Sequence, residues 1–395
     1  MKIIIRNCNV AELDIPLKYA TKLYNEFAIR HPNAFYLRTR QRGMQNWDGK
    51  IKYITKTGQF KIGLLPSVYK RCIELGIKPI IVDMRQPLPK VSKVVTQIGK
   101  YKLRPEQEKA VKAILSNKLG ETPFQIGVLD YTVNAGKTLI MSALYLSYKK
   151  QLKTLLITND SDWLNQARDE FKQYLPGEDI TFVQGKVLNW SNFTIGMVQS
   201  ISRNMKYYQN ELAKIDMVLI DEADQGGSKQ YQNVITRLFN TRVRIGLSGT
   251  IYMSKLAKDK VKNMNLRCFF GDVIAEFKLK DSIKKGYSTK TIVKTVEGKP
   301  WFGNWESDCM SYNEIYDDSI TNNKIAWTMA LDRLKWNLNQ GRYPALVVCK
   351  HIAHCENLYE FFKERLDNTH NIAYVHVNTP TKLRQQIMKD FRRVK

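Results

Sequence analysis

Short apolar runs alternate with amphipathic stretches between about residue 100 and residue 280. The runs are FQIGVLD, TLLITN, TIGMVQ, MVLID and RIGLSG, and polar or glycine-rich residues follow each of them. Such runs are typical of parallel strands that are buried on both faces, with functional loops at their carboxyl ends. The pattern therefore predicts an α/β domain built on a doubly wound parallel sheet.

Different patterns flank this region on both sides. In residues 1–90, IKYI and PIIV predict strands, and LLPSVYKRCIELG predicts an amphipathic helix that stops at Gly76. Two prolines between Gln86 and Lys90 predict a linker. Near residue 287, TKTIVKTV predicts a new strand, followed by a helix near 322–339, a buried strand ALVVCK and a helix from about 353. We expect three domains, at 1–90, 91–285 and 286–395.

The charge of the chain predicts a polyanionic partner. The 395 residues have a formal net charge of +26, and residues 1–100 hold 19 Lys/Arg against 6 Asp/Glu. A basic excess of this density favours nucleic acid, so residues 1–90 are predicted to form a small basic nucleic-acid-binding domain. A merely solvated basic face is the alternative. No apolar run is long enough to predict a membrane span, and six scattered cysteines favour free thiols in a cytoplasmic protein.

The segment VLD-YTVNAGKT-LIMSALYL has the strand, loop and helix order of a phosphate-binding loop. Backbone N–H groups of Asn134, Ala135 and Gly136 would face the phosphates, and Gly136 allows close approach. Lys137 would supply a cation for the β- and γ-phosphates, and Thr138 a hydroxyl for Mg²⁺. The usual first glycine of this motif is replaced by Tyr131, so AGKT alone is a weak signal.

A second signal strengthens this prediction. MVLI precedes Asp221-Glu222-Ala223-Asp224, so carboxylates stand at the end of an apolar strand. Asp221 can hold Mg²⁺, directly or through water, and Glu222 can polarise an attacking water. Lys137, Thr138, Asp221 and Glu222 are therefore the predicted catalytic set, with ATP and Mg²⁺ as cofactors.

Three weaker motifs stand around these two. LRPEQEKAV resembles the helicase Q motif, in which Gln107 would read the adenine edge and Arg104 or Tyr101 would line the pocket. LSGT resembles motif III, with Ser248 and Thr250 as a hydrogen-bond relay between nucleotide and nucleic acid. ITND and VQSI stand at strand ends, where motifs Ia and Ib contact the nucleic-acid backbone. The residues predicted to make these contacts are Thr158, Asn159, Gln199 and Ser200.

The order of these motifs resembles that of a superfamily 2 helicase: LRPEQ, NAGKT, ITND, VQSI, DEAD and LSGT. QNWDGKIKYI…GLLPSVYKRC and VVCKHIAHCENL are similar to phage UvsW-type helicases. The resemblance implies a small basic domain before two RecA-like domains. It also implies ATP-driven unwinding and branch migration of forked or Holliday-junction DNA, by a monomer, in replication, recombination and repair. A nucleic-acid-binding ATP switch, an RNA helicase and a restriction-enzyme motor are the alternatives.

The resemblance stops before motif VI, because no QxxGRxxR sequence precedes Lys395. We expect the second RecA-like domain to be incomplete and the chain to bind ATP and DNA but hydrolyse slowly. A missing arginine finger typically costs about 10³- to 10⁵-fold in turnover.

Further DNA contacts are predicted from cations and aromatics in other places. The set is Arg38, Arg40, Arg42, Trp47, Lys50, Lys350 and His351. Trp47 can instead be a core residue beside an Asp-Gly turn. The stretch Gly298–Trp305 contains three aromatics and is a candidate strand-splitting hairpin, or a hydrophobic cluster that fixes the loop.

Overall fold

This computed structural model describes residues 1–393 except 42, 92, 149, 185–188, 253–256, 294, 296–310 and 367–369. Arg42 and the aromatic stretch Gly298–Trp305 thus lie outside the described residues. The chain divides into two compact units, Met1–Lys290 and Thr291–Lys395. In the described part of the chain no helix is long and apolar enough to cross a membrane.

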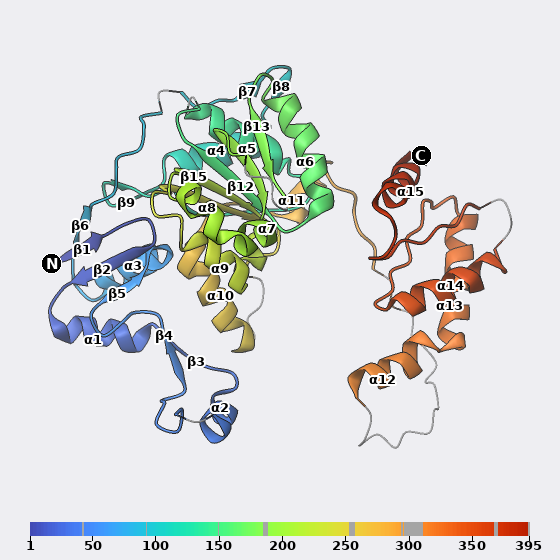
Figure 1. The fold of residues 1–395 in the computed structure, drawn as a ribbon, viewed down its shortest axis with the longest axis horizontal. Helices are drawn as coiled ribbons and strands as arrows, with labels where there is room; N and C mark the ends of the chain where they lie inside the picture. The colour runs from blue at the N-terminus through green and yellow to red at the C-terminus, as the bar shows by residue number, and fades with distance from the viewer. Residues whose placement is uncertain are drawn as a thin grey trace. The chain divides into compact units, whose positions relative to one another are not determined.

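A seven-stranded parallel sheet forms the centre of the first unit (Figure 1). Its strand order is β13-β14-β12-β15-β16-β11-β17. The strands are β11 (Ile126–Tyr131), β12 (Thr154–Thr158), β13 (Ile180–Val183), β14 (Phe193–Met197), β15 (Met217–Asp221), β16 (Val243–Ser248) and β17 (Val273–Phe277). All five apolar runs become strands in this sheet, which confirms the predicted α/β class.

Helices cover both faces of the sheet. They are α4 (Pro105–Leu115), α5 (Lys137–Ser147), α6 (Ser161–Tyr174), α7 (Val198–Arg203), α8 (Met205–Leu212), α9 (Lys229–Ile235), α10 (Ala257–Phe270) and α11 (Leu279–Lys284), with a 3₁₀ turn η2 (Ala223–Gln225). Alternate residues of one strand enter opposite cores: Val218 belongs to the core under α7–α10, and Leu219 to the core under α4–α6. Burial on both faces explains why these strands read as continuous apolar runs.

The first 83 residues form a smaller sheet with the order β5-β2-β1-β6. Its elements are β1 (Lys2–Ile5), β2 (Val10–Asp14), α1 (Leu17–Glu26), β5 (Gln59–Lys61), η1 (Ile62–Leu64), α3 (Leu65–Glu74) and β6 (Ile80–Asp83). Gly76 has a φ of +75° just after α3, as predicted for its stop. The pair β3 (Ala28–Arg30) and β4 (Lys50–Lys52), with α2 (Ala34–Arg40) between them, leaves this sheet. Short pairs β7 (Gln97–Ile98) with β8 (Tyr101–Lys102) and β9 (Lys118–Leu119) with β10 (Thr122–Pro123) complete the unit.

A buried arginine joins the small sheet to the large one. Arg244 of β16 donates from Nη2 to the Cys8 carbonyl at 2.7 Å and to Asn9 Oδ1 at 2.8 Å. Its Nη1 donates to the Phe269 carbonyl at 3.2 Å. Because Ile3 and Ile5 of β1 belong to the same hydrophobic core as Val218 of β15, the two sheets share one interior.

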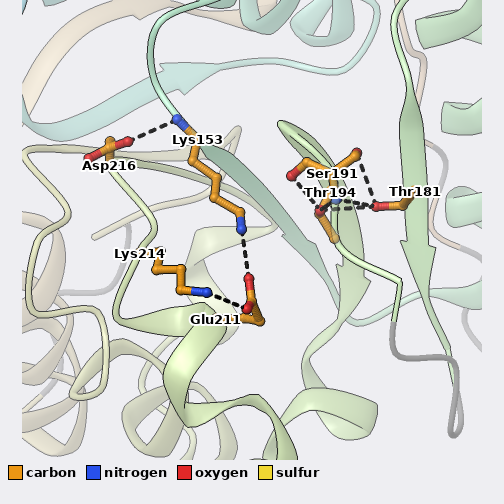
Figure 2. A network of polar contacts seen from close by, with 7 residues as sticks. All are labelled: Lys153, Thr181, Ser191, Thr194, Glu211, Lys214 and Asp216. Atoms are coloured by element: carbon orange, nitrogen blue, oxygen red, sulfur yellow. Dashed lines mark hydrogen bonds and ion pairs between the residues drawn. The ribbon is translucent and has the colours of Figure 1, made fainter.

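Polar side chains fix the amino-terminal edge of the large sheet (Figure 2). Lys153, just before β12, donates its backbone N–H to Asp216 Oδ2 at 2.9 Å and its Nζ to Glu211 Oε2 at 2.6 Å. Thr181 Oγ1 lies 3.1 Å from both Ser191 Oγ and Thr194 Oγ1, which ties β13 to β14. These bonds stabilise the starts of the strands. The loops that carry the predicted motifs follow the strands at the opposite, carboxyl edge of the sheet.

The regular elements among the described residues of the second unit are all helical. They form α12 (Tyr312–Tyr316), the π-helical turn η3 (Asp317–Thr321), α13 (Lys324–Asn339), α14 (Ile352–Lys363) and α15 (Thr381–Arg393), with Trp327, Leu331, Leu358 and Phe362 as their core. The two predicted helices are confirmed. The predicted strand in ALVVCK is wrong, because Leu346 and Val348 are exposed and unpaired with any described strand. In TKTIVKTV the described residues likewise form no strand. A strand needs a hydrogen-bonded neighbour, and the described part of this unit supplies none.

Candidate nucleotide and nucleic-acid site

The loop between β11 and α5 depends on one glycine. β11 ends at Tyr131, whose ring is buried in the core, so the loop begins after the position where the motif usually has its first glycine. Gly136 has a φ of +72°, and a Cβ there would lie 2.3 Å from Gln107 Nε2. Glycine adopts this conformation without strain and leaves room for the Gln107 amide, so the tight approach falls at Gly136 rather than at Tyr131.

Gln107 and Arg104 hold this loop from the start of α4. Gln107 Nε2 donates to the Ala135 carbonyl at 2.8 Å, and its Oε1 accepts from the Arg104 backbone at 2.8 Å. Arg104 Nη2 donates to the Asn134 carbonyl at 3.0 Å. The structure thus brings the predicted base-reading pair onto the predicted phosphate loop. Here the Gln107 amide is engaged with backbone and fixes the loop's shape.

The two strongest motifs meet at the carboxyl edge of the sheet. Lys137 Nζ lies 3.4 Å from Asp221 Oδ1 and 3.8 Å from Glu222 Oε1. Thr138 follows Lys137 in the first turn of α5, and it is buried. Asp221 is only 3% exposed, whereas about half of the Glu222 side chain is exposed. Glu222 has a φ of +51°, so the chain turns sharply just after the strand.

Burial dominates the electrostatics of both carboxyls. It raises the pKa of Asp221, although Lys137 nearby lowers it, and it raises the pKa of Glu222 against the same opposing effect. Asp221 Oδ1 is buried, and the Lys137 ammonium 3.4 Å away is its charged neighbour. A buried carboxylate oxygen and a threonine hydroxyl are the kinds of oxygen ligand that a hard cation such as Mg²⁺ takes, so Asp221 and Thr138 fit such an ion by their chemistry.

Ser248 connects the end of β16 to the carboxylate segment. Its buried hydroxyl donates to Asp224 Oδ1 at 3.0 Å and accepts from the Thr250 backbone N–H at 3.2 Å. The two predicted relay residues, Ser248 and Thr250, therefore share one network with the segment that begins at Asp221. Asp224 is the member of this network whose link to Ser248 the sequence pattern did not predict.

The candidates on the neighbouring strands lie at the same edge. Gln199 Nε2 donates to the Asn159 carbonyl at 3.2 Å, which joins the loop after β12 to α7. Ser200 lies in α7, and its carbonyl accepts from Asn204. Thr158 is buried, and its hydroxyl accepts from the Asp160 backbone at 3.2 Å. Its side chain therefore shapes the turn, whereas its neighbour Asn159 is partly exposed at this edge.

The basic candidates of the small domain lie on the β3–α2–β4 segment. Arg38 and Arg40 occupy the last turn of α2, and Lys50 begins β4. Trp47 Nε1 donates to the Lys50 carbonyl at 3.0 Å, and its ring lies edge-on to His31 at 5.9 Å. Trp47 thus braces its own loop, while the arginines reach solvent.

Lys350 and His351 belong to the second unit and contact its first helix. Lys350 Nζ lies over the rings of Tyr312 and Tyr316, 4.4 Å and 4.6 Å from their centroids. His351 Nδ1 lies 2.8 Å from Asp317 Oδ1. The Thr321 hydroxyl and His351 hold the pKa of Asp317 below its usual value. Both predicted DNA contacts therefore already have partners within their unit.

The structure adds residues that the sequence pattern did not nominate. The Arg104 guanidinium stacks on the Tyr287 ring, 4.3 Å from its centroid, and Lys285 donates to Glu106 Oε2 at 2.7 Å. Tyr101, the aromatic predicted for the base pocket, instead contacts Tyr174 edge-on at 5.1 Å. No motif spacing links Arg104 to Tyr287, because tertiary folding alone brings these distant residues together.

Sequence comparison finds similarity to a restriction-enzyme subunit and to two helicases. Residues 100–253 match the family model described as the type III restriction enzyme, res subunit. The ATP-dependent DNA helicase uvsW of Enterobacteria phage T4 is 23% identical over 357 residues, which is 83% of this chain and 66% of that protein. The chain is thus similar to a UvsW-type helicase over most of its length. A putative ATP-dependent RNA helicase of Acanthamoeba polyphaga mimivirus is 26% identical over 147 residues, 37% of this chain and 27% of that protein. The chain therefore matches less than two thirds of the length of either relative.

Solved structures give the same fold. The crystal structure of the UvsW helicase from phage T4 covers 70% of this chain and 100% of that chain, with a TM-score of 0.56 and 21% identity. A second crystal structure of T4 UvsW covers 100% of this chain and 78% of that chain, with a TM-score of 0.54 and 20% identity. The sheet and its covering helices are thus a RecA-like α/β domain, as the sequence predicted.

Proposed function

We propose that the chain is an ATP-dependent DNA helicase or translocase that unwinds and branch-migrates forked or Holliday-junction DNA in replication, recombination and repair. The observation that carries the proposal is the meeting of Lys137 with Asp221 and Glu222 at one edge of the sheet. A cation in a glycine-containing loop beside two carboxylates, one buried and one half-exposed, is the arrangement that phosphoryl transfer to water requires.

Each residue of the site has a role in this proposal. The backbone of Asn134, Ala135 and Gly136 binds phosphate oxygens, and Lys137 neutralises them. Mg²⁺, when bound, would add positive charge at the phosphates, with Thr138 and Asp221 as its protein ligands. Glu222 orients the attacking water and accepts its proton. Gln107 reads the adenine edge once its amide leaves the Ala135 carbonyl, and Arg104 lines the base pocket. Ser248 with Thr250 passes the nucleotide state to the nucleic acid.

The nucleic acid lies, in this proposal, across the carboxyl edge and the small domain. Asn159, Gln199 and Ser200 contact its backbone, with Thr158 beneath them. Arg38, Arg40 and Lys50 bind phosphates from the small domain, which we assign to residues 1–90, before RecA-like residues 91–285 and the second domain from 286. Lys350 and His351 are further contacts once their present partners release them. We assign the active form as a monomer in the cytoplasm.

Nucleotide binding and turnover test the proposal directly. We expect this chain to bind a fluorescent ATP analogue, and Lys137→Ala to weaken that binding at least about tenfold, because the cation at the phosphates is gone. Lys112→Ala, on the exposed part of α4, is the matched control and should bind normally. ATP hydrolysis is then compared with no nucleic acid, with forked DNA and with an RNA fork of the same sequence.

Strand displacement separates the proposal from its alternatives. Displacement of a forked DNA that requires ATP supports a helicase. Nucleotide-dependent DNA binding with no displacement would instead indicate an ATP switch. Stimulation by the RNA fork that exceeds stimulation by DNA would favour an RNA helicase, as the name of the mimivirus relative suggests for that protein.

A further inference from the structure

An arm leaves the small domain between two of its strands. We define the β3–β4 arm as residues 28–52, which comprise β3, α2, β4 and the loops between them. Its strands pair only with each other, in the register Ala28 with Lys52 and Arg30 with Lys50. In Figure 1 the arm extends from the first unit, with α2 at its far end. The arm is therefore placed to meet something outside the domain core.

The arm is strongly basic. Its sequence contains Arg30, Arg38, Arg40, Arg42, Lys50 and Lys52 but only one acid, Asp48. That acid is used within the arm, since Asp48 Oδ2 lies 3.2 Å from Lys52 Nζ and Oδ1 accepts from the Lys50 backbone at 2.9 Å. The arm therefore has little negative charge of its own to neutralise the cations of α2. These cations are suited to bind the phosphates of a nucleic acid.

Two aromatic rings are exposed on the same short helix. Phe35 is 79% exposed, more than any other aromatic in the part of the chain that the structure describes, and Tyr36 is 54% exposed. The Arg40 guanidinium lies over the Tyr36 ring, 5.0 Å from its centroid. Exposed aromatic rings beside cations are the combination that single-stranded nucleic acid uses, because bases stack on rings while cations bind phosphates.

The arm is held without help from these two rings. Trp47 bonds the Lys50 carbonyl and contacts His31, and His31 accepts the Asn33 backbone N–H at 3.1 Å. Ala34 is buried against the turn at Gly49, where an added Cβ would lie 3.0 Å from the Ala34 Cβ. The arm therefore has its own internal contacts, and the exposed rings at its far end are free for another use.

We propose that the β3–β4 arm binds unpaired bases at a single-strand/duplex boundary. Phe35 and Tyr36 stack on bases that the boundary exposes, and Arg38 and Arg40 hold the adjoining phosphates. Paired duplex hides its base faces in the stack, so the rings distinguish frayed or forked DNA from continuous duplex. The proposal rests on the nucleic-acid-binding function above and names the substrate feature that this domain recognises.

The test compares ring removal with charge removal. The double variant Phe35→Ala/Tyr36→Ala keeps every charge, whereas Arg38→Ala/Arg40→Ala keeps both rings. Affinities of this chain are measured for labelled single-stranded DNA, forked DNA and blunt duplex over a range of salt. Loss of the rings should weaken single-strand and fork binding about tenfold, leaving duplex affinity and the salt slope unchanged. Loss of the arginines should weaken all three and lower the salt slope by about two.

Two controls keep the result interpretable. Phe239→Ala removes another exposed aromatic, between α9 and β16, and should leave all affinities unchanged. The melting temperature of each variant should match that of the parent chain, because the altered side chains are exposed. Failure of the parent chain to bind any DNA would contradict the proposed function itself.

Other outcomes would overturn the arm proposal alone. Equal weakening of duplex and single-strand binding by the ring variant would show that the rings do not read unpaired bases. No weakening at all would exclude them from the DNA contact. Tight binding to anionic vesicles that depends on the rings, with unchanged DNA affinity, would assign the arm to a membrane surface.

Discussion

Arg104, at the start of α4, stacks its guanidinium on Tyr287, which follows α11, at 4.3 Å from the ring centroid. The same guanidinium donates to the Asn134 carbonyl of the phosphate loop at 3.0 Å. Tyr287 thus braces a side chain that holds the loop. This contact joins the last residues of the first unit to the nucleotide site.

We therefore predict that Tyr287→Ala weakens ATP binding several-fold, because Arg104 loses its support. Tyr101→Ala should have a smaller effect, since that ring contacts Tyr174 on α6. Fluorescence titration with an ATP analogue measures both variants, and Tyr287→Phe, which keeps the ring, should bind like the parent. A larger loss in Tyr101→Ala than in Tyr287→Ala would restore Tyr101 as the base-pocket aromatic.

Glu222→Gln should separate ATP binding from hydrolysis. The amide keeps the shape of the side chain but cannot accept a proton, so turnover should fall about 10²- to 10⁴-fold while ATP affinity is retained. Because burial raises the pKa of Glu222, the parent's hydrolysis should decline toward acid pH at a higher value than an ordinary glutamate would give. Single-turnover hydrolysis across pH measures this. A variant whose rate equals the parent's would remove Glu222 from the mechanism.

Asp221→Asn should abolish hydrolysis without lowering stability at neutral pH. Burial raises the pKa of Asp221, so the folded protein binds that proton more tightly than the unfolded chain. Stability from this group is then present at low pH and lost as pH rises through the raised pKa. The amide removes that loss, and the melting temperature should equal the parent's or exceed it by about 2 °C. The difference in melting temperature between variant and parent should shrink in acid. A large fall in the variant's melting temperature at neutral pH would show that the ion pair with Lys137 outweighs the burial of Asp221.

Arg244→Ala should destabilise the protein strongly. The side chain is fully buried, and burial lowers its pKa to about 10. Its removal leaves the Cys8 carbonyl and Asn9 Oδ1 without this donor, which should cost about 3 kcal/mol of unfolding free energy. Urea unfolding measures the cost. Arg71→Ala, which breaks a partly exposed pair with Glu26, is the control and should cost much less than Arg244→Ala. Similar values for the two variants would contradict the role of Arg244 in joining the sheets.

The sequence by itself determined the fold of the central domain and nominated the residues of its candidate site. Runs such as MVLID are apolar throughout because both faces of a parallel sheet are covered, so they identify buried strands without any knowledge of their neighbours. The same runs helped to nominate Lys137 and Asp221, since Asp221 stands at the carboxyl end of one run and Lys137 follows the loop at the carboxyl end of another. Parallel strands bring those ends to one edge of the sheet.

The tertiary structure decided what depends on distant partners. The pattern in ALVVCK satisfied the same rule, yet Leu346 and Val348 are exposed, because a strand also needs a neighbour and no described residue of that unit provides one. The stacking of Tyr287 on Arg104 and the burial of Arg244 against Cys8 have no local signature at all. Hydrophobic periodicity records whether a residue is buried, but only the folded chain determines which residue it is buried against.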